Sequence, residues 1–332
     1  MRLYLFASGG VYDPFVWKNR WVGVCGEQLS FLPFALSSSI VSACLSIRGF
    51  QVHRPSAAWR WSSQRHLSTN SLWGRILAEA SAASDEEPAL ASYLAASILR
   101  HQSLAKSISF ILANKLGNHT LTPVELLHVF NDVLADDDSI IDAIQADLQA
   151  VWDRDPACER YIQVMLFFKG FQAVQAYRIA HVLWKRGRRP LALALQSRIS
   201  DVFHVDIHPA ARIGRGVLLD HATGVVIGET AIVGDNVSIL HHVTLGGSGT
   251  GKGARHPRIG HGVLLGAGVC VLGPVRIGDG SKVGAGSVVV SNIPHHGVAV
   301  GIPAKVVRVG APSDDPMQSM DQVDFFDFGA MI

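Results

Sequence analysis

Apolar residues recur at every sixth position through the carboxy-terminal part of the chain. They form two runs separated by an interruption: Ile213, Leu219, Val225, Ala231, Val237 and Val243, then Ile259, Leu265, Val271, Ile277, Val283 and Val289. Between positions 205 and 310 lie 22 of the chain's 32 glycines. A six-residue period fits neither the helical period of 3.6 nor the period of 2 of a strand. It predicts a parallel β-helix at 204–310, in which each hexapeptide forms one side of a triangular coil. Coils of this hexapeptide class wind left-handed.

The interruption between the two runs is the glycine-rich stretch "GGSGTGKGARHPR" at 246–258. It lacks the G-x-x-x-x-G-K-[ST] spacing of a nucleotide-binding loop. A loop of this length in a rigid repeat more often serves function than connection. We therefore expect an extruded functional loop here.

The pattern upstream of the coil is helical. Residues 71–203 contain a capping box, Thr122 to Glu125, with proline at the first helical position. The stretch 171–189 predicts a long amphipathic helix that ends at basic residues and Pro190. The sequence therefore predicts an all-helical domain followed by the left-handed parallel β-helix.

Residues 1–70 differ in composition from the rest of the chain. They hold seven Lys or Arg and eleven Ser, against two acidic residues, Asp13 and Glu27. This balance is typical of an organelle transit peptide, and the arginines favour the mitochondrion over the plastid. A disordered extension of a cytosolic protein is the alternative. The apolar stretch 31–47 is short for a membrane span and is broken by Pro33.

The remaining composition excludes several classes of function. The chain has 332 residues and a formal net charge of +2, too small to indicate a nucleic-acid partner. Four cysteines lie far apart with no C-x-x-C spacing, which argues against disulfides and zinc knuckles. Residues 311–332 carry five Asp and no Lys or Arg, and this predicts a flexible acidic tail.

The densest polar cluster opens the coil and contains Asp206, His208, Asp220 and His221. Asp206 and His221 are fifteen residues apart, close to one 18-residue turn, so we expect them near the same edge of neighbouring turns. A carboxylate beside an imidazole favours one tautomer and makes a general base. The alternative is a pair of solvated corner residues.

Several segments closely resemble the serine acetyltransferase family: "DIHPAARIGRGVLLDHATGVVIGETA", "SILHHVTLGG", "RHPRIG" and "GIPAKVV" in the coil, and "RDPACERY" and "FKGFQAVQAYRIAHVLW" in the helical part. The resemblance spans roughly residues 71–310. It implies that acetyl-CoA and L-serine give O-acetyl-L-serine and CoA, in cysteine biosynthesis. His221 would deprotonate the serine hydroxyl, and Asp206 would orient His221. Because no Cys or Ser lies beside this pair as a nucleophile, direct attack on the thioester is favoured over an acyl-enzyme.

The resemblance also implies the groups that bind the amino acid. Asp155 and Asp220 would meet its ammonium, and Arg255 and His256 would receive its carboxylate. This agrees with the charges of an amino acid, which needs an anion and a cation.

Acetyl-CoA is expected as a co-substrate in a groove between neighbouring subunits, with no permanently bound cofactor. The oxyanion would meet backbone N–H groups of Gly246 and Gly247. Six candidate acetyl-CoA contacts follow: Gly246, Gly247, Ala267, Ala285, Lys282 and Lys305. No metal is predicted, although some hexapeptide coils bind zinc and other histidines occur here (His204, His241, His242, His261, His295 and His296).

The resemblance implies partners as well. In this family a carboxy-terminal isoleucine, here Ile332, docks into O-acetylserine sulfhydrylase (cysteine synthase). The coil implies a homotrimer, and the helical domain could pair two trimers. Two alternatives stay open: an acetyltransferase acting on a sugar hydroxyl, and a regulatory scaffold that mainly binds the sulfhydrylase.

Overall fold

The computed structural model describes residues 69–249, 251 and 253–320. The predicted transit segment, except its last two residues, and the predicted docking residue Ile332 lie outside these ranges. Helices occupy 69–203: α1 (Thr69–Glu86), α2 (Ala91–Leu94), α3 (Leu104–Leu116), α4 (Pro123–Ala135), α5 (Asp138–Arg154), α6 (Tyr161–Phe167), α7 (Lys169–Lys185) and α8 (Arg189–Phe203). A 3₁₀ turn (Pro88–Leu90) and a π-helical turn (Ala95–Leu99) flank α2.

The predicted capping box starts α4. The Thr122 hydroxyl accepts from the N–H of Glu125 at 3.3 Å, and the Glu125 carboxylate accepts from the N–H of Thr122 at 3.0 Å. Two backbone donors that the helix leaves without partners are thus satisfied. The prediction from the T-x-x-E spacing is confirmed.

Helix α7 differs from its prediction as an amphipathic helix. Residues 170–180 are buried without interruption, so the helix is covered on all sides. It lies between other helices and the coil, and it contacts α4, α5, α8 and β3. The sequence predicts Pro190 just after the end of this helix. Pro190 also lies in the first turn of the next helix, α8.

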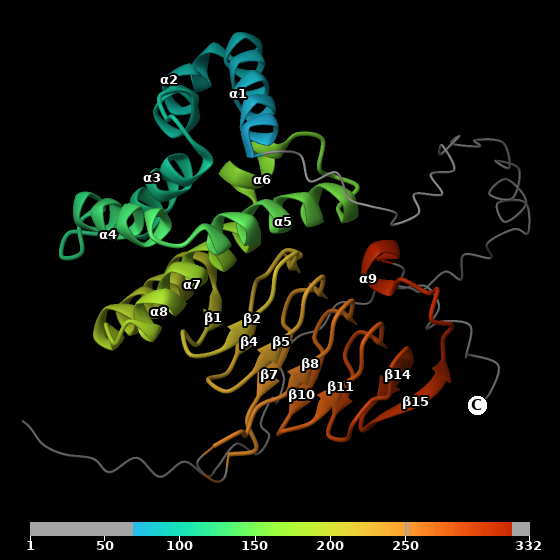
Figure 1. Cartoon of the computed structure of the whole chain (residues 1–332). Helices are drawn as coiled ribbons and strands as arrows, with labels where there is room; N and C mark the ends of the chain where they lie inside the picture. Colours follow the sequence, from blue (N-terminus) through green and yellow to red (C-terminus); the bar gives the residue numbers. More distant parts are fainter. Residues whose placement is uncertain (1–68, 250, 252, 321–332) are drawn as a thin grey trace, which may run out of the picture. The chain divides into compact units, whose positions relative to one another are not determined.

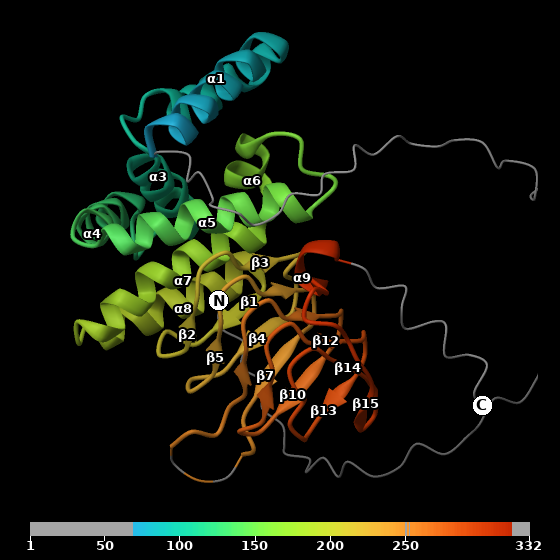
Figure 2. The ribbon, with the colours of Figure 1, turned by 45° about the vertical axis from the view of Figure 1, so that its right-hand side comes forward.

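The coil consists of fifteen strands among the described residues, arranged in three sheets (Figures 1 and 2). Sheet A contains β1 (Val205–Ile207), β4 (Val225–Ile227), β7 (Thr244–Gly246), β10 (Cys270–Leu272) and β13 (Val288–Val289). Sheet B contains β2 (Arg212–Ile213), β5 (Ile232–Val233), β8 (Arg258–Ile259) and β11 (Arg276–Ile277). Sheet C contains β3 (Leu218–Leu219), β6 (Ser238–Ile239), β9 (Leu264–Leu265), β12 (Lys282–Val283), β14 (Gly297–Gly301) and β15 (Ala304–Val309). All pairs are parallel except the final β14–β15 hairpin, so the predicted parallel β-helix is confirmed.

The interior of the coil is formed by the predicted sixth-position residues. Eleven of the twelve are buried, with exposed fractions from 0% to 5%. The exception is Ile213, which is half-buried and lines a hollow beside α5 and α7. Because one apolar side chain per side points inward, a single column of Val, Leu and Ile fills each side of the prism.

The chain passes from sheet A to B to C and back to A in every turn, which defines two edges of sheet A. The A–B edge contains 208–211, 228–231 and the loop 247–257, and the C–A edge contains 220–224, 240–243, 266–269 and 284–287. The first turn is longer than 18 residues, because Asp206 pairs with Val226. The extra length of the first turn determines where Asp206 lies relative to His221.

The start of the predicted flexible tail folds back on the domain. A short helix, α9 (Pro316–Ser319), buries Met317, whose carbonyl accepts from the Ser238 hydroxyl at 3.2 Å. Gln318 Nε2 donates to the carbonyl of Asp153 at 3.4 Å. The buried Pro316 and Met317, together with these two hydrogen bonds, hold the first part of the acidic segment against α5 and sheet C.

Candidate functional site

The segment "DHATG" forms a strained turn at the C–A edge. His221 and Ala222 both have positive φ, 54° and 58°, which is rare for residues other than glycine. Two short backbone bonds hold the turn, from Ala222 N–H to Asp220 at 2.6 Å and from Thr223 N–H to His221 at 2.7 Å. The turn leaves the His221 side chain 76% exposed. Backbone strain at a residue whose imidazole is exposed indicates a functional role for His221.

Helix α7 packs directly against this turn. Gly170 lies against the coil so closely that a Cβ at this position would be 2.1 Å from the carbonyl oxygen of Leu219 and 3.1 Å from the Cβ of Ala222. The neighbouring Lys169 ammonium donates to the Thr223 hydroxyl. Lys169 and Gly170 therefore allow α7 to pack closely against the His221 turn. A larger residue at Gly170 would force α7 away from the coil.

The carboxylate of Asp220 lies beside His221, and that of Asp155 lies near enough to act on Asp220. The Asp220 carboxylate is 3.8 Å from His221 Nε2. Asp155, at the end of α5, approaches it from the helical domain. Burial is the main cause that raises the pKa of Asp220, and the negative charge of Asp155 raises it further, whereas His221 and His241 oppose the shift. An acidic pair of this kind is suited to bind an ammonium group.

The C–A edge continues along the coil as a column of corner residues. In register with His221 follow His241, Ala267 and Ala285, and the His241 ring meets that of His221 edge-on at 5.9 Å. The two predicted acetyl-CoA contacts, Ala267 and Ala285, thus lie on the same edge as the predicted base. Their small side chains leave the edge beyond His241 open to a ligand.

The A–B edge holds the predicted carboxylate-binding pair. Arg255 Nη2 is 2.9 Å from the Glu229 carboxylate, and the guanidinium remains one-third exposed. His256 is 7% exposed, and its Nδ1 lies 2.8 Å from the Thr230 hydroxyl oxygen. Burial and the charge of Arg255 lower the pKa of His256, so the ring is neutral at neutral pH. An arginine beside a neutral imidazole can bind a carboxylate.

Asp206 lies on the outer face of sheet A and not beside His221. Its carboxylate accepts from Gln196 Nε2 at 2.7 Å, and its charge acts on His208. Burial is the main cause that lowers the pKa of His208, and Glu229 and Asp206 oppose it. Within one chain the expected Asp206–His221 contact is not formed. The physical reason is the twenty-residue first turn, which places Val226 next to Asp206 and leaves His221 on the corner.

The predicted site residues therefore form two groups at opposite edges of sheet A. Asp155, Asp220 and His221 lie at the C–A edge, and Arg255 and His256 lie at the A–B edge. Sheet A strands are up to three residues long, about 10 Å, which is beyond the reach of a hydrogen bond.

The other candidate acetyl-CoA contacts lie in different surroundings. Gly246 ends β7, and a Cβ on Gly247 would be 3.1 Å from His256 Nε2. Lys282 is 4% exposed in sheet C, so its ammonium is not offered to a ligand at the surface. Lys305 is exposed in β15. Of the two lysines, Lys305 is the one that a phosphate can reach.

Two surface hollows of similar volume lie near these elements. One of about 320 Å³ borders the A–B edge and is lined in part by Glu229 and Thr230. The other, of about 330 Å³, lies between α5, α7 and the first turn, where Tyr177 and Lys185 line it. Neither hollow is lined by a predicted site residue, so neither of them locates the chemistry.

Among residues 69–249, 251 and 253–320, no group of three or more His, Cys, Asp or Glu could hold a metal ion. In the same part of the chain, no helix has the length and apolar character needed to cross a membrane.

Sequence reasoning gave no role to three side chains in contact with this site: Glu229, Thr230 and His241. The first two belong to the "GETA" segment, one turn of the coil before Arg255 and His256. The loop hides this proximity, because it adds residues between the contacting turns. A count of residues that omits the loop would have brought them into register.

Comparisons with known proteins show the family of this chain. A family model described as "Serine acetyltransferase, N-terminal" matches residues 72–176, and one described as "Bacterial transferase hexapeptide (six repeats)" matches 256–291. Serine acetyltransferase 4 of Arabidopsis thaliana is 53% identical over 254 residues, which cover 76% of this chain and 71% of that protein.

Solved structures of serine acetyltransferases also resemble this chain. Soybean serine acetyltransferase complexed with serine has a TM-score of 0.70 and 58% identity, covering 71% of this chain and 97% of its own. A serine acetyltransferase in complex with cysteine has a TM-score of 0.75 and 44% identity, covering 76% and 98%. The chain belongs to the serine acetyltransferase family.

Proposed function

We propose that this chain transfers the acetyl group of acetyl-CoA to the hydroxyl of L-serine, giving O-acetyl-L-serine and CoA. The observation that carries the proposal is the division of charge at the two edges of sheet A. An acidic pair beside an exposed imidazole can bind and deprotonate an amino alcohol, and Arg255 with His256 can bind its carboxylate. The membership of the serine acetyltransferase family supports serine over a sugar as the acceptor.

The site would be completed between two copies of the chain. The outer face of sheet A carries exposed Val226 and Leu272, together with half-buried Thr244, Cys270 and Val288. On sheet C, α9 packs against β6, and sheet B presents Arg212, Arg258 and Arg276. An apolar face without a cover favours packing against another copy. Packing about a threefold axis would bring the C–A edge of one chain to the A–B edge of the next.

The mechanism follows from this pairing. His221 takes the proton of the serine hydroxyl as its oxygen attacks the thioester carbonyl. Backbone N–H groups at Gly246 and Gly247 would stabilise the oxyanion of the tetrahedral intermediate. When the intermediate collapses, the C–S bond breaks, and the imidazolium of His221 returns its proton to the CoA sulfur. Asp206 would orient His221 from the neighbouring chain, where the face of sheet A meets the C–A edge.

Acetyl-CoA would lie along the C–A edge as a co-substrate. Ala267 and Ala285 continue the column of His221 and leave room for its pantetheine arm, and Lys305 is placed on an exposed strand for a phosphate. No permanently bound cofactor is required, because general-base transfer from a thioester needs none.

A screen of acceptors tests the function. The purified chain is incubated with acetyl-CoA and either L-serine or amino sugars and sugars, and release of the CoA thiol is measured. L-serine should be the preferred acceptor. A preference for a sugar would contradict the proposal, and absence of turnover with retained binding to the sulfhydrylase would favour the scaffold alternative.

The proposals for partner and location concern residues outside the described ranges. Ile332 would dock into O-acetylserine sulfhydrylase, so deleting it should abolish co-elution of the two enzymes and leave acetyl transfer unchanged. Residues 1–70 would direct the chain to the mitochondrion. Fusion of this segment to a fluorescent protein tests the location, and plastid or cytosolic fluorescence would contradict it.

A further inference from the structure

The hydroxyl oxygen of Thr230 lies among three nitrogen atoms of the "RHP" segment. It accepts from the backbone N–H of Arg255 at 3.1 Å and from that of His256 at 3.2 Å. It is also 2.8 Å from His256 Nδ1, which in turn lies 3.2 Å from the backbone N–H of Thr230. One side chain thus contacts both the backbone and the ring of the predicted carboxylate-binding residue.

These contacts determine which groups donate. A threonine hydroxyl has two acceptor lone pairs and a single proton. Both lone pairs face backbone N–H groups, so the proton is directed to His256 Nδ1. The Thr230 N–H also points at Nδ1. A nitrogen that faces two donors carries no proton, and the proton of a neutral ring therefore lies on Nε2.

We propose that Thr230 is a positioning residue that fixes His256 as the neutral Nε2–H tautomer, so that this N–H donates to the carboxylate of the amino-acid substrate. This inference rests on the proposed function and adds the source of its specificity. A ring with the proton on Nδ1 would present a lone pair to the carboxylate and repel it.

Close packing at Nε2 holds the His256 ring in place. The ring lies against Gly228 and Gly247: a Cβ on Gly228 would be 2.0 Å from Nε2, and one on Gly247 would be 3.1 Å away. The charged and titratable groups that act on His256 are Arg255 from its own loop, Glu229 from the β4–β5 corner and His208 from the β1–β2 corner. Burial and Arg255 lower its pKa, which keeps the ring neutral.

Substitutions that keep or remove the hydroxyl test the proposal. Thr230→Val keeps the shape and removes the hydroxyl, and Thr230→Ser keeps the hydroxyl. We expect Thr230→Val to lower kcat/KM for serine about 10- to 100-fold, as for the loss of a hydrogen bond to a charged group, mainly through KM. Thr230→Ser should restore most of the wild-type value.

A double-mutant cycle separates action through His256 from damage to the loop. In a His256→Ala background, Thr230→Val should lower kcat/KM much less than in the wild type, by under about threefold. An equal loss in both backgrounds would overturn the proposal, because Thr230 would then act without His256. If the wild type itself does not acetylate serine, the proposed function fails. If the wild type acetylates serine and Thr230→Val has the same kcat/KM for serine, only this inference fails.

The pH dependence supplies a readout that a structural role would not change. The imidazolium carries a proton on Nε2 whichever tautomer the neutral ring takes. The ratio of kcat/KM between wild type and Thr230→Val should therefore shrink as pH falls from about 8.5 to a pH well below the ordinary imidazole pKa, where His256, with its lowered pKa, becomes protonated. A ratio that stays constant over this range would contradict the assigned tautomer.

Discussion

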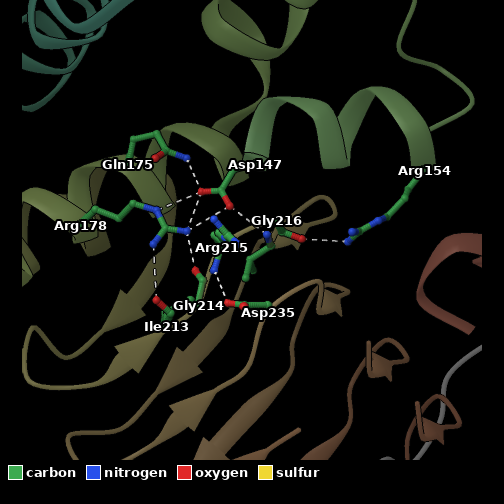
Figure 3. A network of polar contacts seen from close by, with 10 residues as sticks. Asp147, Arg154, Gln175, Arg178, Ile213, Gly214, Arg215, Gly216 and Asp235 are labelled. Atoms are coloured by element: carbon green, nitrogen blue, oxygen red, sulfur yellow. Dashed lines mark hydrogen bonds and ion pairs between the residues drawn. The ribbon is translucent and has the colours of Figure 1, made fainter. Parts of the chain in front are cut away.

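Asp147 and Arg178 form a buried ion pair between α5 and α7, with Arg178 Nη2 2.7 Å from Asp147 Oδ2 and side chains 1% and 8% exposed. The pair also joins the helices to the coil (Figure 3). Asp147 accepts from the N–H of Val217 at 2.8 Å, and Arg178 donates to the carbonyl of Gly214 at 2.7 Å. Helical domain and coil thus share one polar network at their junction.

Breaking this pair should destabilise the protein strongly. Asp147→Asn leaves the buried guanidinium without a counter-charge, so we expect the free energy of unfolding to fall by about 3–5 kcal/mol. Denaturation with urea measures this change. Asp136→Asn, which removes an exposed partner of Arg186, is the matched control and should change stability by less than about 1 kcal/mol. Equal effects of the two substitutions would show that the buried pair has no special role.

The exposed imidazole at the strained turn leads to a second prediction. Asparagine tolerates positive φ better than other polar residues, so His221→Asn should keep the turn and the oligomer. The loss of a general base should lower kcat by at least about 100-fold. Stopped assays of CoA thiol release measure kcat, and circular dichroism checks the fold. His261→Asn, at an exposed histidine of the B–C edge, should keep wild-type turnover.

The fold was predictable because its rules are local or periodic. The inward column at Val225, Val237 and Val243 follows from the six-residue period alone, and the cap at Thr122 follows from its neighbour Glu125. The comparisons confirm the family and serine acetyl transfer, as the motifs predicted.

The arrangement of the site could be predicted only in part. The charge of Asp155 acts on Asp220 because α5 ends near this part of the coil, and α7, which packs against α5, lies against Leu219 at Gly170. The six-residue period of the sequence does not reveal how the helices pack against the coil. The pairing of Asp206 with His221 was expected from a uniform turn of 18 residues, whereas the first turn has twenty. Long-range packing and irregular turns therefore limit what spacing reveals.

A site divided between two edges of sheet A should be restored by mixing two chains that are each defective at one edge. His221→Asn removes the C–A edge function and His256→Ala weakens the A–B edge function. In randomly mixed trimers, about a quarter of the sites would combine two intact edges. We expect the mixture, refolded together, to recover activity that neither variant has alone. Native mass spectrometry verifies that the two chains have mixed.

The control for this experiment is a mixture of two variants at one edge. His221→Asn combined with Asp220→Ala leaves every site with a defective C–A edge, so no recovery is expected. If the first mixture also fails to recover although mixed oligomers form, the site lies within one chain and both edges must approach each other by another route.

The half-buried carboxylate of Asp220 should lower the stability of the protein, although it serves to bind the substrate ammonium. Its pKa is raised in the folded protein by burial and by Asp155, so folding favours the protonated form. The folded state then binds more protons than the unfolded state between the ordinary pKa and the raised one, and stability falls as pH rises through that window. Asp220→Asn removes this penalty. At neutral pH the variant should melt at a higher temperature than the wild type, and the difference should vanish at a pH below the ordinary carboxyl pKa.

Asp220→Asn should also raise KM for serine roughly tenfold or more, because the ammonium loses one carboxylate. A variant with unchanged KM would remove Asp220 from the ammonium site.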